Sequence, residues 1–100
     1  MLEIRKTNAY AKWIDGLRDL KGRARILVRV ERLTTGNLGD VKSVGEGVCE
    51  LRIDFGPGYR VYFTQRGQEV VILLAGGDKS TQAADIKESL NKSTFFIFMR

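Results

Sequence analysis

Histidine is absent from the sequence, and cysteine occurs only once, as Cys49. A single cysteine excludes an internal disulfide. The lack of histidine excludes a His-based catalytic triad and leaves too few ligands for a tightly held zinc ion. We therefore expect neither a metal nor another cofactor. Any catalysis must use lysine, arginine, tyrosine, carboxylates or hydroxyls, because the thiol of Cys49 is expected to be buried and inert.

Long apolar runs are also absent, since none approaches the roughly 20 residues that a membrane-spanning helix requires. The N-terminal segment carries charges early and has no apolar core of the kind found in signal peptides. These two absences predict a cytoplasmic protein without membrane contact. Its 100 residues are expected to form a single domain, 1–100.

Acidic residues are outnumbered by basic ones, 12 against 17, which gives a net charge of +5. An excess of positive charge favours a polyanionic partner such as RNA, DNA or the ribosome, or an acidic protein. A merely basic, solvated surface would account for the same charge. Net charge alone therefore does not choose the function.

Two helices are predicted after an N-terminal strand at residues 2–6. The first helix is expected to begin at Thr7 or Asn8 and to be broken at Lys21-Gly22, and the second is expected to end at Gly36. Together they form a helical hairpin. The residues expected to face the core are Ala9, Trp13, Leu17 and Leu20 in the first helix and Ile26, Leu27, Val30 and Leu33 in the second, where Arg25, Arg29 and Arg32 form an outer stripe.

The second half of the chain predicts an antiparallel meander and a last helix, which makes the fold class α+β. Gly56-Pro57-Gly58 and Arg66-Gly67-Gln68 have the length and the glycine that hairpin turns require. The strand at 69–75 is apolar throughout from Val70 to Ala75 and is expected to be covered on both faces. The other strands are expected at 41–44, 48–54 and 59–65, and the last helix, capped by Asp78 or Ser80, places Ala83, Ile86 and Leu90 in the core.

The Gly-Pro-Gly turn predicts a register for the hairpin around it. If Phe55 faces Tyr59, two faces with different chemistry result. Leu51 pairs with Phe63 and Ile53 with Val61 on a core face that includes Cys49, whereas Arg52 pairs with Tyr62 and Asp54 with Arg60 on an outer face. That outer face is either a solvated surface with an Asp54–Arg60 ion pair or a functional site.

Two arginines fixed on a sheet suit the cleavage of RNA by its own 2′-hydroxyl, because guanidinium groups stabilise the negative charge of a pentacoordinate phosphate. Lys79 is a further candidate for contact with the phosphate, because it lies at a helix N-terminus. Alternatively, it is an ordinary solvated loop lysine. The glycine spacing before Lys79 is wrong for a phosphate-binding loop. Trp13 is expected to anchor a helix on the sheet rather than to stack on a base.

The stretches GNLGDVKSVGEGVCELRIDFGPGYRVYF and VVILLAGGDKSTQAADI closely resemble the HigB-like branch of the RelE/ParE toxin superfamily, and the resemblance extends over residues 2–88. It implies a RelE-like fold. It also implies the toxin of a type II toxin–antitoxin system, a ribosome-dependent messenger RNA endoribonuclease that blocks translation. A cognate antitoxin, often a helix-turn-helix DNA-binding protein, would neutralise the toxin and would alone connect it to operator DNA.

By position, the resemblance implies that Arg60 contacts the scissile phosphate, that Arg52 is a second basic contact, and that Lys79 lies close to the active site. Some HigB relatives carry an active-site histidine that this chain lacks, so the groups that transfer protons remain open. Further candidates for substrate contact are Lys42, which the resemblance suggests, and Tyr62 and Asp54, which share the outer face.

Two other functions also remain open for this fold. ParE-type relatives inhibit DNA gyrase without catalytic residues, and a toxin-like protein without activity would act only as an antitoxin-binding co-repressor. The presence of Arg52 and Arg60 on one face favours the nuclease.

The C-terminal residues 95–100 depart from the relatives, because Phe95, Phe96, Ile97 and Phe98 form an atypical apolar tail. The segment is too short for a membrane span. It is expected to be an extra strand, a patch covered by a partner, or the product of an altered reading-frame end.

Overall fold

The computed structural model describes residues 2–98, with side chains for residues 2–93. Its strands are β1 (Glu3–Lys6), β2 (Val41–Gly45), β3 (Val48–Ile53), β4 (Tyr59–Arg66) and β5 (Val70–Gly77). Its helices are α1 (Asn8–Asp15), α2 (Leu20–Leu33) and α3 (Gln82–Phe98). The strands form one sheet in the order β1-β5-β4-β3-β2, in which β1 runs parallel to β5 and the other neighbours are antiparallel.

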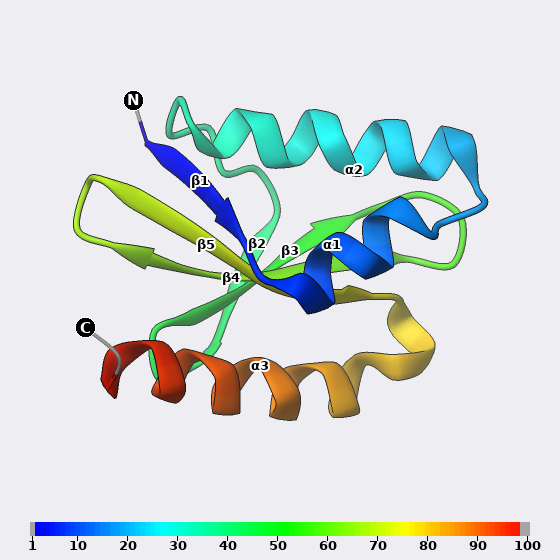
Figure 1. Ribbon diagram of the computed structural model, residues 1–100. Coiled ribbons are helices and arrows are strands. Elements are labelled where there is room, and N and C mark those ends of the chain that lie inside the picture. Colours follow the sequence, from blue (N-terminus) through cyan, green and yellow to red (C-terminus); the bar gives the residue numbers. More distant parts are fainter. Residues whose placement is uncertain (1, 99–100) are drawn as a thin grey trace.

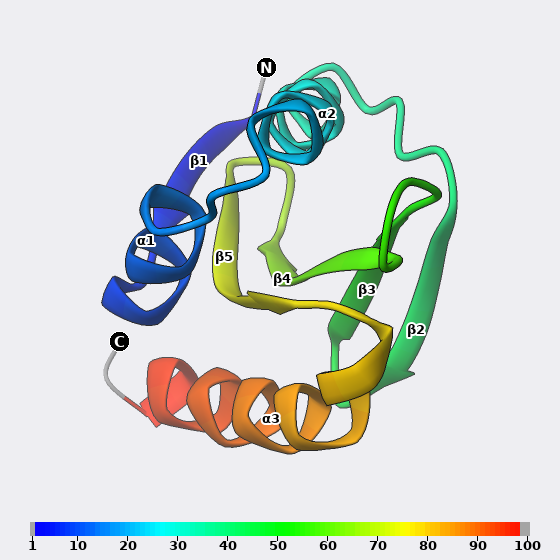
Figure 2. The same cartoon turned by 90° about the vertical axis from the view of Figure 1, so that its right-hand side faces the viewer.

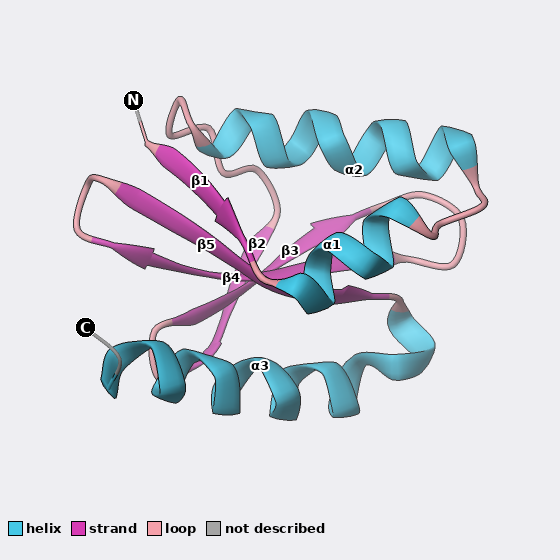
Figure 3. Cartoon of the chain, viewed as in Figure 1, coloured by secondary structure: helices cyan, strands magenta, loops and turns pink. Residues whose placement is uncertain are grey.

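Helices cover both faces of the sheet, α1 and α2 on one and α3 on the other (Figure 1, Figure 2). This arrangement is α+β, as predicted, and it is consistent with the RelE-like fold that the resemblance implied (Figure 3). Strand β5 is covered on both faces, because Val71 and Leu73 belong to the core under α1 and α2 while Ile72 and Leu74 belong to the core under α3. No helix in the described part of the chain is long and apolar enough to cross a membrane.

The break between α1 and α2 lies earlier than predicted. Helix α1 ends at Asp15, and Asp19 caps α2 by accepting a hydrogen bond from the backbone N–H of Gly22 at 3.0 Å. Gly22 is therefore inside α2 and does not break a helix. A Cβ at Gly22 would lie 2.5 Å from Cε2 of Tyr59, so glycine is needed there for close contact between α2 and the start of β4.

The buried face of α2 is narrower than predicted. Ile26, Val30 and Leu33 are buried, but Leu27 is 46% exposed and Leu20 is 72% exposed, so the prediction that these two leucines face the core is wrong. Leu20 begins α2 instead of ending α1, and Leu27 is one residue out of phase with the i, i+4, i+7 set that faces the sheet.

Gly36 terminates α2, as predicted, because the N–H groups of Gly36 and Asn37 donate to the carbonyls of Leu33 and Arg32, both at 3.2 Å. The hydroxyls of Thr34 and Thr35 donate to the carbonyls of Glu31 and Arg32 at 2.7 and 2.9 Å, which satisfies two of the last carbonyl groups of the helix. Gly36, with φ of +82°, lies in the turn that follows.

A short 3-10 turn at Lys79–Thr81 precedes α3. Asp78 caps this turn, because its carboxylate accepts from the backbone N–H of Ser80 at 2.8 Å. Of the two predicted caps, Asp78 is therefore the correct one, and α3 proper begins at Gln82.

Helix α3 packs on the sheet through Ile86 and Leu90, as predicted. Ala83 is exposed, so its predicted place in the core is wrong, and Ser89 is buried instead. The backbone of α3 stays helical as far as Phe98, which rules out the predicted extra strand for residues 95–98. The other two predictions for the apolar tail are a patch covered by a partner and an altered reading-frame end. Both stay predictions, because the side chains of residues 94–100 lie outside the described residues.

Adjacent glycines let helices approach β5 closely from both sides. A Cβ on Gly76 would overlap the ring of Trp13 from α1, and a Cβ on Gly77 would overlap Asp85 of α3 and lie 2.6 Å from Oγ1 of Thr81. The ring of Trp13 also lies against Tyr10 and Tyr59, with centroids 6.0 and 6.4 Å away. Trp13 is thus the anchor between helix and sheet that the sequence predicted.

Candidate functional site

The hairpin β3–β4 determines which charged side chains meet. Arg52 lies opposite Arg60, and Glu50 lies opposite Tyr62, so the predicted register is wrong by two residues. The turn is longer than expected, because the last pair is Ile53 with Tyr59 and the N–H of Gly58 closes a turn on the carbonyl of Phe55 at 3.1 Å. A shift of two residues keeps each side chain on its predicted face but changes its partner.

The new register brings Arg52 and Arg60 side by side and removes the predicted Asp54–Arg60 ion pair. Among the described side chains, both arginines form their ion pairs with Glu50 instead. Glu50 is completely buried and was not among the site residues predicted from the sequence. The signal was a glutamate between Cys49 and Leu51 in a buried strand, on the same face as the two arginines.

Glu50 binds four donors from β3, β4 and α3. They are Nε of Arg52 at 2.8 Å, Nη1 of Arg60 at 3.4 Å, the hydroxyl of Tyr62 at 3.0 Å and Nε2 of Gln82 at 2.9 Å. Burial raises the pKa of Glu50, but the hydrogen bonds from Arg52, Gln82 and Tyr62 and the charge of Arg60 outweigh it and hold the pKa below its ordinary value. The buried group is therefore a carboxylate.

The hydroxyl of Tyr62 serves this carboxylate and does not face solvent. Tyr62 is fully buried, so the prediction that it shares an open face with the arginines is wrong. Helix α3 covers that part of the face. Burial, and then the negative charge of Glu50, raise the pKa of Tyr62, which keeps the hydroxyl protonated as a donor.

Beyond Glu50, the two arginines border an open cavity of about 300 Å³, which we call the basic basin. The side chain of Arg52 is 35% exposed and that of Arg60 is 12% exposed. Glu50 engages one nitrogen of each guanidinium, and Nε of Arg60 is buried without a hydrogen-bond partner. The basin is lined by Asp40, Arg52, Ile53, Asp54, Gly58, Tyr59, Arg60 and Lys79.

Lys79 reaches the basin because its backbone is tied to the hairpin turn. Its N–H donates to the carbonyl of Pro57 at 3.4 Å, and its side chain is exposed. Neither Asp40 nor Asp54 forms an ion pair among the described side chains, although both line the basin. Three cations and the carboxylates of Asp40 and Asp54 therefore line one cavity, and among the described side chains only Glu50 forms an ion pair with any of these cations.

Lys42 is the predicted site residue that does not join the basin. It lies opposite Glu50 on β2, and its side chain is exposed. The structure thus brings together Arg52, Arg60, Lys79 and Asp54, leaves Lys42 on the neighbouring strand, and buries Tyr62 beneath the site.

The remaining reactive group is the thiol of Cys49, which is partly buried and packs against the core under α1 and α2. Burial raises its pKa, so the thiol stays protonated and is a poor nucleophile. Within the described residues, no group of three or more cysteines and carboxylates is placed to hold a metal ion.

The chemistry that this geometry allows is the binding of an anion such as a phosphate diester. Two guanidinium groups present several donors from a fixed support, and Lys79 adds a mobile charge at the rim. Because Glu50 holds the arginines before any ligand arrives, little side-chain freedom is lost on binding.

Known proteins similar to this chain match the region that contains the basin. Residues 12–91 match the family model described as Phage derived protein Gp49-like (DUF891). A protein of Haemophilus influenzae, named only as an uncharacterized protein, is 49% identical over 88 residues, which are 88% of this chain and 89% of the relative. No solved structure matches the chain. The matched residues include both strands of the β3–β4 hairpin, the basin and most of α3. The chain belongs to the Gp49-like family of phage-derived proteins.

Proposed function

We propose that this protein is the toxin of a type II toxin–antitoxin module and that it cuts messenger RNA on the ribosome. The Gp49-like family and the resemblance of the ELRI and GPGYRVYF motifs to HigB-like proteins support the toxin assignment. The nuclease assignment rests on one observation: Arg52 and Arg60 lie side by side over a buried carboxylate and face an open basin.

In this proposal, Arg60 and Arg52 bind the scissile phosphate. The 2′-oxygen of the preceding ribose attacks phosphorus, the bond to the 5′-oxygen breaks, and the arginines stabilise the extra negative charge of the pentacoordinate state. Lys79 and Asp54 at the rim are the candidates for moving the protons, with assistance from the ribosome as the alternative. No metal or cofactor takes part.

The decisive test is Arg60→Ala. Loss of a contact that strengthens in the transition state should slow messenger cleavage on programmed ribosomes by roughly 10²–10³. Arg60→Lys should recover only part of the rate, because an ammonium group lacks the planar fork. Arg66→Ala is the matched control, since it removes an arginine from the opposite end of β4.

Folding must be measured for each variant, because Arg60 is only 12% exposed and binds Glu50. Arg60→Ala is therefore expected to lower the melting temperature modestly. A folded Arg60→Ala protein that cleaves at the wild-type rate would refute the nuclease site. Growth arrest without messenger cleavage would point to ParE-type inhibition of gyrase. If the wild-type protein caused neither growth arrest nor cleavage, the antitoxin-binding co-repressor would remain.

The proposal includes a cytoplasmic setting and a cognate antitoxin, with a helix-turn-helix protein as the expected type and operator DNA reached only through it. The net charge of +5, together with Arg52, Arg60 and Lys79 against Asp40 and Asp54 in the basin, favours an antitoxin with acidic segments over this face. Affinity for such an antitoxin should fall as salt is raised.

A further inference from the structure

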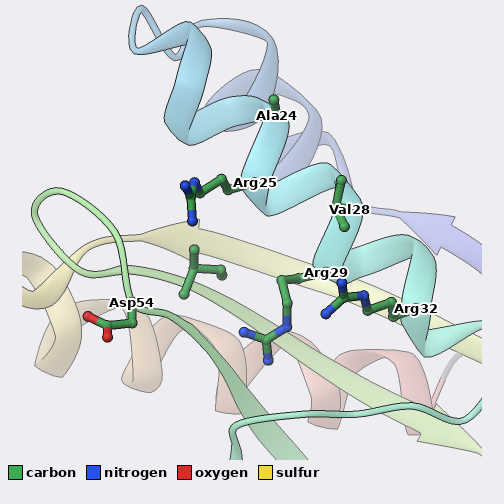
Figure 4. A pocket seen from close by; sticks show the side chains of 7 residues that line it. Ala24, Arg25, Val28, Arg29, Arg32 and Asp54 are labelled. Atoms are coloured by element: carbon green, nitrogen blue, oxygen red, sulfur yellow. The ribbon is translucent and has the colours of Figure 1, made fainter.

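A second groove, with a volume of about 390 Å³, lies between α2 and the end of β3. Figure 4 shows the side chains of Arg25, Arg29 and Arg32 extending from α2 toward the strands, with Asp54 at the far wall. The lining residues are Ala24, Arg25, Val28, Arg29, Arg32, Ile53 and Asp54. We call this the α2 groove.

Its three arginines follow one face of the helix. Spacings of four and seven residues place them in a row, and Arg25 and Arg32 are about 10 Å apart along the helix axis. None of the three forms an ion pair among the described side chains, and Asp54 is the only acid in the lining. The groove therefore carries a net positive charge.

Two of the arginines are held in place by neutral groups. Arg29 donates to the carbonyls of Arg52 and Leu38 at 2.6 and 3.2 Å, which fixes it between α2 and β3. Arg25 lies over the ring of Phe55, 4.6 Å from its centroid. These contacts orient the guanidinium groups and leave their charge uncompensated.

The α2 groove adjoins the basic basin at the end of β3. Ile53 and Asp54 line both cavities, so one wall is shared. Arg29 also binds the backbone of Arg52, the residue whose side chain faces the basin. The arginines of α2 and the side chains of Arg52 and Arg60 lie on opposite faces of the sheet, so a strand that occupied both cavities would pass around the end of β3 at Asp54.

We infer that the α2 groove binds the sugar–phosphate backbone of the RNA segment that flanks the scissile phosphate, an inference that rests on the proposed nuclease function. A row of cations next to a phosphate-binding basin suits a strand with one charge per nucleotide. The stacked Arg25 and Phe55 offer a flat surface for a base. An acidic protein fits less well, because Ala24 and Val28 are small anchors for a protein interface.

The test compares two fluorescent 2′-O-methyl RNAs, a trinucleotide and a dodecamer, which cannot be cleaved because the attacking hydroxyl is blocked. Only the dodecamer can occupy both cavities. Anisotropy would be measured on the full chain, for the wild type and for the double variant Arg25→Ala/Arg32→Ala. The matched control is Lys12→Ala/Lys87→Ala, which removes the same charge from exposed positions on α1 and α3.

The double variant should bind the dodecamer roughly tenfold more weakly at low salt and should lower the slope of log affinity against log salt by about 1.4, because each phosphate contact of a single strand contributes about 0.7. Binding of the trinucleotide should not change, and the control should resemble the wild type. Thermal melts followed by circular dichroism would establish that each variant is folded.

An equal loss for both RNAs, or a loss no larger than that of the control, would overturn the inference. So would a defect seen only with ribosomes or only in antitoxin binding, which would assign the groove to ribosomal RNA or to the antitoxin. Arg60→Ala separates this inference from the proposed function. If Arg60→Ala weakens neither RNA while the α2 variant still weakens the dodecamer, the basin fails as the phosphate site and the groove stands.

Discussion

The two faces of the sheet are built from the same strands but bury different chemistry. Under α1 and α2, the buried cluster consists of aliphatic and aromatic side chains, such as Ile26, Leu51 and Phe63. Under α3, apolar residues such as Tyr62 and Leu74 are joined by the buried polar residues Glu50, Thr64, Ser89 and Ser93.

The two faces therefore contribute differently to the stability of the fold and to the construction of the site. An apolar face needs only complementary shape, whereas a buried carboxylate is tolerated only when donors replace its water. Glu50 has four such donors, two of them arginines that also reach the basin. The face under α3 thus holds the arginines in place, and the face under α1 and α2 supplies most of the apolar burial.

The largest effect is expected from removing one aromatic ring on each face. Phe63→Ala and Tyr62→Ala should each lower the free energy of unfolding by about 3–5 kcal/mol, because both rings are buried on their own side of the sheet. Urea denaturation would measure both. A loss below about 1 kcal/mol for Tyr62→Ala would contradict the burial of that face beneath α3, and with it the environment of Glu50.

The sequence predicted the sheet and its faces well, because side chains alternate with a period of two along a strand. Cys49 and Leu51 were placed on the core face, and Arg52 and Arg60 were placed together on the other, as found. The uniform apolarity of β5 also predicted that helices cover it from both sides.

The partners across the hairpin could not be predicted in the same way. The register depends on how the chain closes its turn, and Gly56 and Gly58, with φ of +55° and +79°, allow a longer turn than the sequence suggested. Which face α3 covers also depends on tertiary packing, since nothing local in the sequence marks Tyr62 as buried. Glu50 was not predicted because its role becomes visible only when two things are known: the register of the β3–β4 hairpin and the face that α3 covers.

The paired glycines of β5 provide a second test of the two faces. Gly76→Ala should cost about 1–3 kcal/mol, because the new methyl group meets the ring of Trp13, which is held in the core. Gly77→Ala should cost less, since the atoms it meets are the carboxylate end of Asp85 in α3 and the hydroxyl of Thr81 in the 3-10 turn, which can move more easily than a packed ring. Thermal melts would rank the two.

A double variant makes this test specific. If contact with Trp13 is what destabilises Gly76→Ala, the double variant with Trp13→Phe should lose less unfolding free energy than the sum of the two single variants. The smaller ring leaves room for the methyl group. Strict additivity of the two changes would show that the close approach of α1 to β5 is not what requires glycine.

The smallest expected effect concerns charge alone, in the variant Glu50→Gln. Glutamine keeps the shape of the side chain but gives the arginines a neutral partner, so stability at neutral pH should fall by about 1 kcal/mol. The folded-state pKa of Glu50 is held below its ordinary value of 4.5. Its contribution to stability is therefore complete above that value and is lost as the pH falls through the folded-state pKa.

Urea unfolding measured from neutral pH into the acid range should thus show the wild type and Glu50→Gln converging only below pH 4.5. Glu69→Gln is the control, because Glu69 is exposed in the turn between β4 and β5. A gap between wild type and Glu50→Gln that stays constant with pH would mean that the buried group does not act as a carboxylate. The arginines would then owe their positions to packing, and the contrast between the two faces would be one of shape rather than of charge.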